Sequence, residues 1–302
     1  MIAALIIAAG KTTHRDRFEP EKEAGTISNL QRIVKVFQRA DIDRVVVVCE
    51  EDEDHTTKLA ARMNVVFLYS RGGADMFENV KTGLAYLRNK CEAAVITHVA
   101  VPLFSVQTVR GLISTEAPVC IPSHHGVTGH PMLLRSEYFD QISTYSGENG
   151  LDGAVKASGL QTRIVAVEDE GILVNVHYED DYARLVAGHS LMALHPDASI
   201  SLVREKTFYD PHTHQLLRLT EETASLRESC RQMGISYSKG RGMISLIEEQ
   251  LGLSVIESRQ GGKSGGYSLV TEEGKELMRK YTEFCAEAKQ NIYKLFEAYF
   301  TK

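Results

Sequence analysis

Hydrophobic residues follow two different rhythms along the first 190 residues of the chain. Continuous apolar runs of about four to eight residues are typical of strands buried on both faces, whereas apolar residues three and four apart are typical of amphipathic helices. The runs predict strands at 2–8, 44–49, 65–68, 93–99 and 118–121, and the spacing predicts helices at 27–39, 54–63, 76–89 and 106–114. Strands that alternate with helices in this way predict βαβ units around a mostly parallel sheet.

The pattern changes near residue 190. Further strands are predicted at 132–135, 162–167 and 172–176, a helix follows at 179–186, and then His195-Pro196-Asp197 interrupts the chain. A length of 302 residues suits two domains. We therefore predict one domain over residues 1–190, a boundary within 188–198, and a second domain over residues 198–302.

Beyond the boundary, two short β pieces precede a series of predicted helices at 215–223, 225–233 and 237–251. Ser225 is a plausible N-cap of the second helix, and Glu228 would complete a capping box. Gly234-Ile235-Ser236 reads as a three-residue turn, in which the glycine supplies a positive φ and the serine caps the third helix. This order predicts a helix-turn-helix whose third helix presents side chains to base edges.

Residues 258–271 contain four glycines between two short β-rich runs, which predicts a hairpin with a thin tip. Arg259 and Lys263 suit such a tip to contact with phosphate. The net charge of −6 arises entirely before residue 191, because the remainder holds 15 basic and 15 acidic residues. An acidic total argues against nucleic-acid binding by the whole chain but leaves room for a local basic face.

The C-terminal third resembles the N-terminal domain of the molybdate-responsive transcription regulators, a ModE-like family related to the LysR-type winged helix. The resemblance is carried by Ser225–Cys230, by Gly234-Ile235-Ser236-Tyr237, and by the glycine-rich stretch 261–266 with 269–274 after it, and it covers about residues 198–283. It implies a winged helix-turn-helix domain that binds duplex DNA. The DNA-binding residues it implies are Ser236, Tyr237, Ser238, Lys239, Arg241, Arg259, Lys263 and Ser264.

The predicted reading helix departs from that family at one place. The family usually has a tryptophan inside this helix, whereas this chain has Gly242, two residues after Gly240. Each glycine in a helix interior costs about 1 kcal/mol relative to alanine. The two glycines serve either close packing of this helix or its close approach to DNA. They also allow the helix to read a DNA sequence different from the one that the family reads.

Residues 276–300 contain neither glycine nor proline, and their apolar side chains recur at alternating spacings of three and four. This seam predicts a long helix. It is either a core helix of its own domain or a dimerisation helix, and we favour the homodimer because a small winged domain offers little else to pack against. The seam residues are Leu277, Tyr281, Phe284, Ala288, Ile292, Leu295 and Tyr299.

The N-terminal domain resembles the molybdenum-cofactor nucleotidyltransferase family, MobA-like enzymes that transfer CMP or GMP onto molybdopterin. The matching features, in order, are Ile6-Ile7-Ala8-Ala9-Gly10, residues 75–79 with Gly83, Val101-Pro102-Leu103 with Thr108, residues 129–133, and residues 179–182. The resemblance covers about residues 1–188 and implies a Rossmann-like fold with a nucleotide, CTP or GTP, at the carboxyl ends of the strands. The nucleotide-binding residues would be Ala9, Gly10, Lys22 and Asn79.

The reactive positions depart from that family. Its first loop carries Arg-Met-Gly, where this chain reads Thr13-His14-Arg15-Asp16, and its magnesium-binding aspartate is replaced by Ala100. The late acidic motif is replaced by 175–179, Asn-Val-His-Tyr-Glu. Mg²⁺ is held by carboxylate oxygens, so the sequence predicts no metal site and impaired catalysis. Asp16, Asp75 or Asp152 could substitute, although no spacing supports it, and His98, His130 and His177 are either a binding cluster or unrelated histidines.

Two main interpretations follow. The first is a DNA-binding regulator whose N-terminal domain senses a nucleotide or pterin-type ligand or assembles the dimer. The second is an active molybdopterin cytidylyl- or guanylyltransferase with an attached regulatory domain, and a third is a scaffold that binds neither nucleotide nor DNA. The five cysteines show no metal or disulfide spacing, and no apolar run reaches membrane length, so we expect a cytoplasmic protein with free thiols and no membrane contact.

Overall fold

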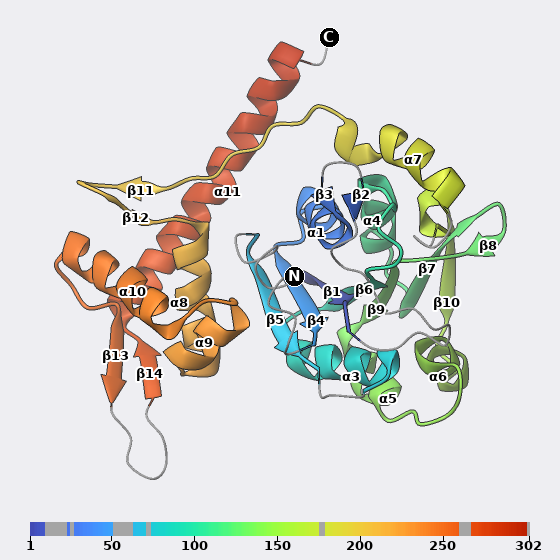
Figure 1. The fold of residues 1–302 in the computed structure, drawn as a ribbon, viewed down its shortest axis with the longest axis horizontal. Coiled ribbons are helices and arrows are strands. Elements are labelled where there is room, and N and C mark those ends of the chain that lie inside the picture. The colour runs from blue at the N-terminus through green and yellow to red at the C-terminus, as the bar shows by residue number, and fades with distance from the viewer. Residues whose placement is uncertain are drawn as a thin grey trace. The chain divides into compact units, whose positions relative to one another are not determined.

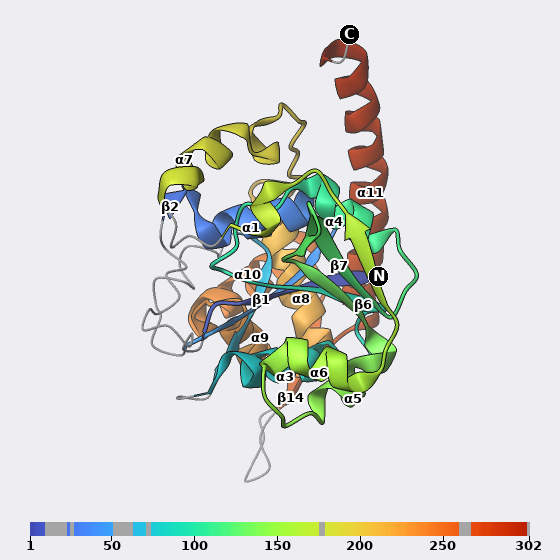
Figure 2. The same cartoon turned by 90° about the vertical axis from the view of Figure 1, so that its right-hand side faces the viewer.

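The computed structural model describes residues 1–9, 23–24, 27–50, 63–70, 74–174, 179–259 and 267–300. Within these residues the chain divides into two compact units, Met1–Ala193 and Leu194–Lys302. No helix of the described residues is both long enough and apolar enough to cross a membrane. Figures 1 and 2 show the elements of each unit.

The N-terminal unit is built on one mixed sheet with the strand order β10-β7-β9-β6-β1-β4-β5, and β8 pairs with β7. The strands β6, β1, β4 and β5 are parallel neighbours, as predicted, whereas β9 lies antiparallel between β6 and β7. The strands are β1 (Ile2–Ile7), β4 (Arg44–Cys49), β5 (Val65–Tyr69), β6 (Ala93–His98), β7 (Val119–His124), β8 (Val127–Thr128), β9 (Met132–Arg135) and β10 (Thr162–Ala166), with β2 (Glu23–Ala24) and β3 (Ile27–Ser28) as a separate pair.

Helices cover both faces of this sheet (Figures 1 and 2). One face carries α1 (Asn29–Arg39) and α4 (Val106–Ile113), and the other carries α3 (Met76–Leu87), α5 (Phe139–Ser143) and α6 (Gly150–Ser158). Successive strand residues point to opposite faces, so Ala4 and Ile6 of β1 join the core under α1 and α4. The remaining helix, α7 (Glu179–Gly188), begins after the undescribed residues 175–178.

Two predicted elements of this unit are corrected by the structure. Helix 27–39 begins only at Asn29, because the Ser28 side chain and Gln31 form a capping box and residues 27–28 form β3. The strand predicted at 172–176 is not present where it is described. Ile172 instead ends the 3-10 helix η2 (Glu170–Ile172), because the Asp169 carboxylate accepts a hydrogen bond from Gly171 N and turns the chain. The predicted helix 54–63 lies almost wholly outside the described residues.

The C-terminal unit contains a small helical core followed by a hairpin and one long helix (Figure 1). Its elements are β11 (Leu202–Val203), β12 (Thr207–Tyr209), α8 (Pro211–Thr223), α9 (Leu226–Gln232), α10 (Tyr237–Leu251), β13 (Ile256–Arg259), β14 (Tyr267–Val270) and α11 (Glu272–Phe300). Fully buried Tyr209, Leu216 and Ile247 join β12, α8 and α10. β13 and β14 pair antiparallel, as expected for the predicted hairpin.

Helix caps decide where these elements begin. Ser225 and Ser236 accept hydrogen bonds from the third backbone N–H of α9 and α10, and Gly234 between the helices has φ 62°, all as predicted. The capping box predicted at Glu228 is wrong, because its carboxylate accepts from Arg231 and Gln232 instead of the Ser225 backbone. α8 begins earlier than predicted because Asp210 caps it ahead of a proline at its first position.

The five cysteines are free thiols, as predicted, and Cys49, Cys120 and Cys230 are buried. Burial raises the pKa of the Cys230 thiol to about 11. Cys230 therefore stays protonated and packs as a small apolar side chain.

Candidate functional site

The first turns of α10 form an exposed polar surface on the helical core of the C-terminal unit. Ser236, Tyr237, Ser238, Lys239 and Arg241 are all exposed there. Neither Lys239 nor Arg241 makes an ion pair with any described residue, whereas Arg231 on α9 pairs with Glu228 at 2.8 Å. The Arg227 guanidinium lies 5.0 Å from the centre of the Tyr237 ring, which adds a third cation beside this turn.

The two glycines of α10 have different surroundings. A Cβ at Gly240 would lie 2.2 Å from the Cys230 Sγ, so only glycine lets α10 approach α9 this closely. A Cβ at Gly242 would meet nothing within 4 Å, and Gly242 is exposed. Close packing therefore accounts for Gly240 but not for Gly242.

A buried polar group joins α8 to α9. The hydroxyl oxygen of Thr220, which is fully buried, lies 3.2 Å from Ser229 Oγ, and Thr223 Oγ1 lies 3.1 Å from the same oxygen. Each of the three hydroxyls donates to a backbone carbonyl, so the packed group is satisfied and helps to fix the relative orientation of the two helices. This group was not foreseen, because Thr220 and Ser229 are nine residues apart in different helices.

The hairpin is attached to the helices at both of its strands. Ser268 N of β14 donates to Ala224 O after α8, and the Glu248 carboxylate of α10 accepts from the N–H groups of Val255 and Ile256 before and within β13. α10 and the base of the hairpin are thereby held in one arrangement. Arg259 ends β13, whereas Lys263 and Ser264 lie outside the described residues.

In the N-terminal unit, Ala9 and Asn79 lie near the carboxyl ends of the parallel strands. Ala9 lies two residues after β1, and Asn79 lies in the first turn of α3, fully buried. Asn79 Oδ1 accepts from Ser70 Oγ at 2.6 Å beyond β5, while Asn79 Nδ2 has no partner among the described residues. A buried donor without a partner is suited to an oxygen of a ligand. Gly10 and Lys22 lie outside the described residues.

Two histidines meet at this same edge. His98 ends β6, and its ring packs edge-on against His130 with 4.6 Å between ring centres. Burial lowers the pKa of His98 to about 3, with a contribution from His130, and lowers the pKa of His130 to about 4. Both imidazoles are therefore neutral at pH 7. The third predicted member, His177, lies outside the described residues.

The described residues at this edge do not fit Mg²⁺. Ala100 is buried and has no ligand atom, and Asp75 uses a carboxylate oxygen to cap α3. Asp152 pairs with Lys156 on α6, and Asp169 accepts from Ser105 N and Thr108 Oγ1. Asp16 lies outside the described residues. Mg²⁺ needs several oxygen ligands in an octahedral arrangement, and neutral imidazoles are poor substitutes.

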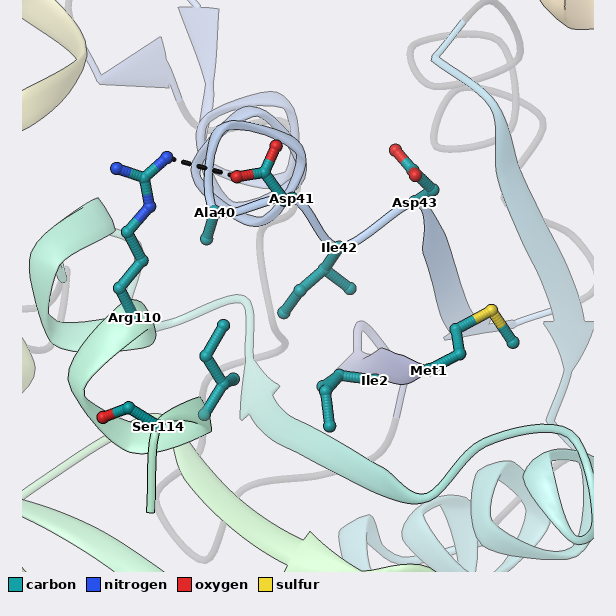
Figure 3. A pocket seen from close by; sticks show the side chains of 9 residues that line it. Met1, Ile2, Ala40, Asp41, Ile42, Asp43, Arg110 and Ser114 are labelled. Carbon is teal, nitrogen blue, oxygen red and sulfur yellow. Dashed lines mark hydrogen bonds and ion pairs between the residues drawn. The ribbon is translucent and has the colours of Figure 1, made fainter. Parts of the chain in front are cut away.

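A hollow of about 430 Å³ lies at the opposite edge of the sheet (Figure 3). It is formed where β1 and β4 begin, and Arg110 pairs there with Asp41 at 3.3 Å. Asp43 adds a second carboxylate, so the hollow does not favour an anionic nucleotide. Its lining residues are Met1, Ile2, Ala40, Asp41, Ile42, Asp43, Arg110, Ile113 and Ser114.

Helix α11 is buried only near its beginning. Met278 and Tyr281 pack into the C-terminal unit, and the Tyr281 hydroxyl donates to Ile200 O at 2.7 Å. Of the remaining seam, Phe284 is 53% exposed, Leu295 59% and Tyr299 75%. The far end of the helix and residues 194–196 enclose an apolar hollow of about 360 Å³, lined by Leu194, His195, Pro196, Ile292, Leu295, Phe296, Tyr299 and Phe300.

The family model for the MobA-like NTP transferase domain matches residues 4–163, just over half of the 302-residue chain. The chain therefore belongs to the MobA-like NTP transferase domain family. Solved structures agree at the level of the fold. A Mycobacterium sp. strain JC1 homologue of Mycobacterium tuberculosis Rv0371c is 18% identical with a TM-score of 0.52, over 64% of this chain and 98% of that one. A nucleotidyl transferase from Methanothermobacter is 16% identical with a TM-score of 0.54, over 62% and 97%.

A second similarity is to transcription regulators. The chain is 26% identical over 91 residues to the DNA-binding transcriptional dual regulator ModE of Escherichia coli strain K12, and equally to the transcriptional regulator ModE of Shigella flexneri. This match covers 30% of the chain. The chain spans about a third of the length of these curated relatives, 34% in each case.

Proposed function

We propose that this protein is a DNA-binding transcription regulator, in which a winged helix-turn-helix over residues 198–302 is joined to a nucleotidyltransferase-fold domain over residues 1–190 that has lost efficient catalysis. The observation that carries the proposal is the exposed start of α10, where Lys239 and Arg241 have no acidic partner among the described residues. A short turn, a hairpin and the similarity to ModE accompany it.

The arrangement suits entry of α10 into a DNA major groove. The side chains of Ser236, Tyr237, Ser238, Lys239 and Arg241 are exposed, so base edges and phosphates can reach them. Ser236 would do so while its Oγ caps α10. Gly242, which has open space around its Cα, would let the DNA backbone come close to the helix. Arg259 with Lys263 and Ser264 would add phosphate contacts from the hairpin, which acts as the wing.

The N-terminal domain would supply the signal. The carboxyl edge of its sheet offers the orphaned amide of Asn79 and the neutral rings of His98 and His130, which suit an uncharged or hydrogen-bonding ligand group. We propose a nucleotide (CTP or GTP) or a pterin-type ligand, bound without Mg²⁺ and held by residues that include Ala9, Gly10, Lys22 and Asn79.

The C-terminal helix would assemble a homodimer. Beyond Tyr281 the exposed seam side chains Phe284, Leu295 and Tyr299 form an apolar strip that a second copy of the chain would bury. In sedimentation, Leu295→Glu with Tyr299→Glu should convert a dimer to a monomer. Lys294→Glu, which places the same residue at a neighbouring exposed position of α11, should leave the dimer intact. An unchanged dimer in the double variant would refute this assembly.

A binding experiment tests the DNA proposal. Lys239→Ala with Arg241→Ala should lower the affinity for duplex DNA about a hundredfold or more, because two cations at the base-reading turn are lost. The control is Lys156→Ala with Arg163→Ala, which removes two exposed cations from the N-terminal unit. Duplexes recovered by selection from a random library provide the probe. Equal affinity of the two double variants in a gel shift would overturn the proposal.

A second function is favoured by the fold family and by the orphaned Asn79 amide, namely an active nucleotidyltransferase with an attached regulatory domain. Calorimetric titration with CTP and GTP separates the two. Binding that is indifferent to Mg²⁺ and releases no pyrophosphate in the presence of molybdopterin supports the sensor. Metal-dependent binding with pyrophosphate release would establish the enzyme, and absence of both nucleotide and DNA binding would leave a scaffold.

A further inference from the structure

A second cluster of histidines lies at the far margin of the N-terminal sheet. His124 ends β7, His125 follows it, and Glu168 comes two residues after β10, the parallel neighbour of β7. The ligand atoms of these three side chains all lie within 4.8 Å of one another. They form the one group of three metal-ligating side chains at such distances among the described residues.

The tautomer of His124 is set by its surroundings. His124 Nδ1 lies 3.1 Å from the carbonyl oxygen of Val167. A carbonyl oxygen only accepts hydrogen bonds, so this contact favours the tautomer with the hydrogen on Nδ1, which leaves Nε2 for a metal ion. Histidines that bind metals usually donate their second ring nitrogen to a carbonyl or carboxylate in this way, which orients the ring and raises its basicity.

The backbone that carries the cluster is held on both sides. Val167 N donates to Ser123 O at 2.9 Å, which fixes Glu168 beside the end of β7. On the other side His124 pairs with Val127 across the β7–β8 hairpin, so His125 and Gly126 form its two-residue turn with φ 48° and 83°. This tight turn holds His125 directly beside His124, in a left-handed conformation that histidine adopts more readily than most residues.

We propose that His124, His125 and Glu168 form a binding site for a divalent transition-metal ion of the Zn²⁺ type. Two imidazole nitrogens and one carboxylate oxygen match the ligand preference of such ions and not that of Mg²⁺ or Ca²⁺. Ligand atoms around Zn²⁺ lie about 3.3 Å apart for bonds of about 2.0 Å. The exposed side chains of His125 and Glu168 can close the remaining gap by rotation, and the open positions would be filled by water.

Titration of the full-length, chelator-treated protein with Zn²⁺ tests the site. We expect His125→Asn and Glu168→Gln each to weaken Zn²⁺ binding by at least about tenfold. Asparagine keeps the preference for positive φ at the turn, and glutamine keeps the shape of glutamate, so both variants should fold. Glu116→Gln, an exposed carboxylate elsewhere in the same unit, and His195→Asn, a histidine of the other unit, are the matched controls and should bind as the parent does.

A spectroscopic measurement locates the ion independently. Paramagnetic Co²⁺ should broaden the imidazole NMR signals of His124 and His125 before those of the remaining histidines. An unchanged Zn²⁺ affinity in both His125→Asn and Glu168→Gln would overturn the proposal. Absence of Zn²⁺ binding to the parent, or broadening that starts at other histidines, would overturn it equally. None of these outcomes depends on whether the protein binds DNA.

Discussion

The carboxyl edge of the N-terminal sheet and the exposed start of α10 differ in how many of the residues expected for their function are present. At the sheet edge, the resemblance to nucleotidyltransferases puts Ala100 in the place of a metal-binding aspartate, and the neutral pair His98 and His130 lies at the same edge. At α10, Lys239 and Arg241 stay exposed. Burial of apolar strand residues stabilises the sheet, so its fold can persist when the residues at its carboxyl edge change. A fold is therefore weak evidence for the activity associated with it.

Among single substitutions, the largest effect on stability should come from the contact that positions α10. Gly240→Ala should destabilise the C-terminal unit by about 1–3 kcal/mol, because the added Cβ would lie 2.2 Å from the Cys230 Sγ. Gly242→Ala, in open space two residues away, should stabilise the same helix by up to about 1 kcal/mol. Chemical denaturation followed by circular dichroism measures both changes. Equal effects of the two substitutions would mean that close packing does not explain Gly240.

The same pair of variants sharpens the proposed DNA contact. Gly242→Ala leaves the fold intact, so a loss of DNA affinity in this variant would show that the helix surface meets the DNA closely at that point. Gly240→Ala with Cys230→Ala should recover part of the lost stability, because the clashing sulfur is gone.

Low pH should next change the stability of the two units to different extents. The folded pKa values of His98 and His130, about 3 and about 4, lie below the ordinary 6.5 of an unfolded chain. At pH values between the folded and the unfolded pKa, the unfolded chain binds more protons than the folded protein does. The free energy of unfolding therefore falls as pH falls, by at most about 1.4 kcal/mol per pH unit for each histidine. Above pH 6.5 this contribution is complete and constant.

In the C-terminal unit, burial lowers the pKa of His214 on α8 to about 4. Hydrogen exchange followed by mass spectrometry reports each unit separately. Between pH 6.5 and 4.5, peptides of β6 and β9 should lose protection more steeply than peptides of α8. His130→Gln should flatten the response of β6 and β9 alone, and an unaltered response would assign the acid sensitivity to other groups.

A smaller effect is expected at the proposed ligand site. Asn79→Ala should weaken binding of CTP or GTP about tenfold, because it removes the buried amide donor that has no partner among the described residues. Ser70→Ala removes the neighbour of Asn79 Oδ1 and keeps that donor, so it should weaken binding less. Calorimetry measures both affinities. A stronger effect of Ser70→Ala would shift the ligand contact from the amide to the hydroxyl.

The smallest effect should come from the wing. Arg259→Ala should reduce DNA affinity only a few-fold and lower the slope of log affinity against log salt by about one, as expected for a single phosphate contact. Fluorescence anisotropy at several salt concentrations gives this slope. A change in base preference with an unaltered slope would instead place Arg259 on a base edge.

Helices, strands and caps were predicted well where a local sequence pattern alone decides the structure. Strand 44–49 and helix 106–114 were evident from apolar periodicity, and the Ser225 and Ser236 caps were evident from serine before an amphipathic stretch. The strand predicted at 172–176 is wrong over its described residues. Ile172 is buried in the core as the last residue of a 3-10 helix that Asp169 caps. An apolar residue indicates burial but not the backbone conformation that achieves it.

The candidate sites also divide into those formed by consecutive residues and those formed by distant segments. The exposed turn of α10 could be predicted because its residues are consecutive. The cluster of His124, His125 and Glu168 was missed, because Glu168 joins the histidines only through the pairing of β10 with β7. The orphaned amide of Asn79 also depends on what surrounds it, which no local pattern contains.

The sequence by itself determined the alternation of strands and helices, the two serine caps around Gly234, and the absence of the expected carboxylate at Ala100. Each is a property of residues close together in the chain. Tertiary structure alone decided that β9 enters antiparallel between β6 and β7, and that only the first part of α11 is buried. It also decided that a Cβ at Gly240 would clash with Cys230 while one at Gly242 would face open space. These outcomes depend on contacts between distant segments, which form only when the whole unit packs.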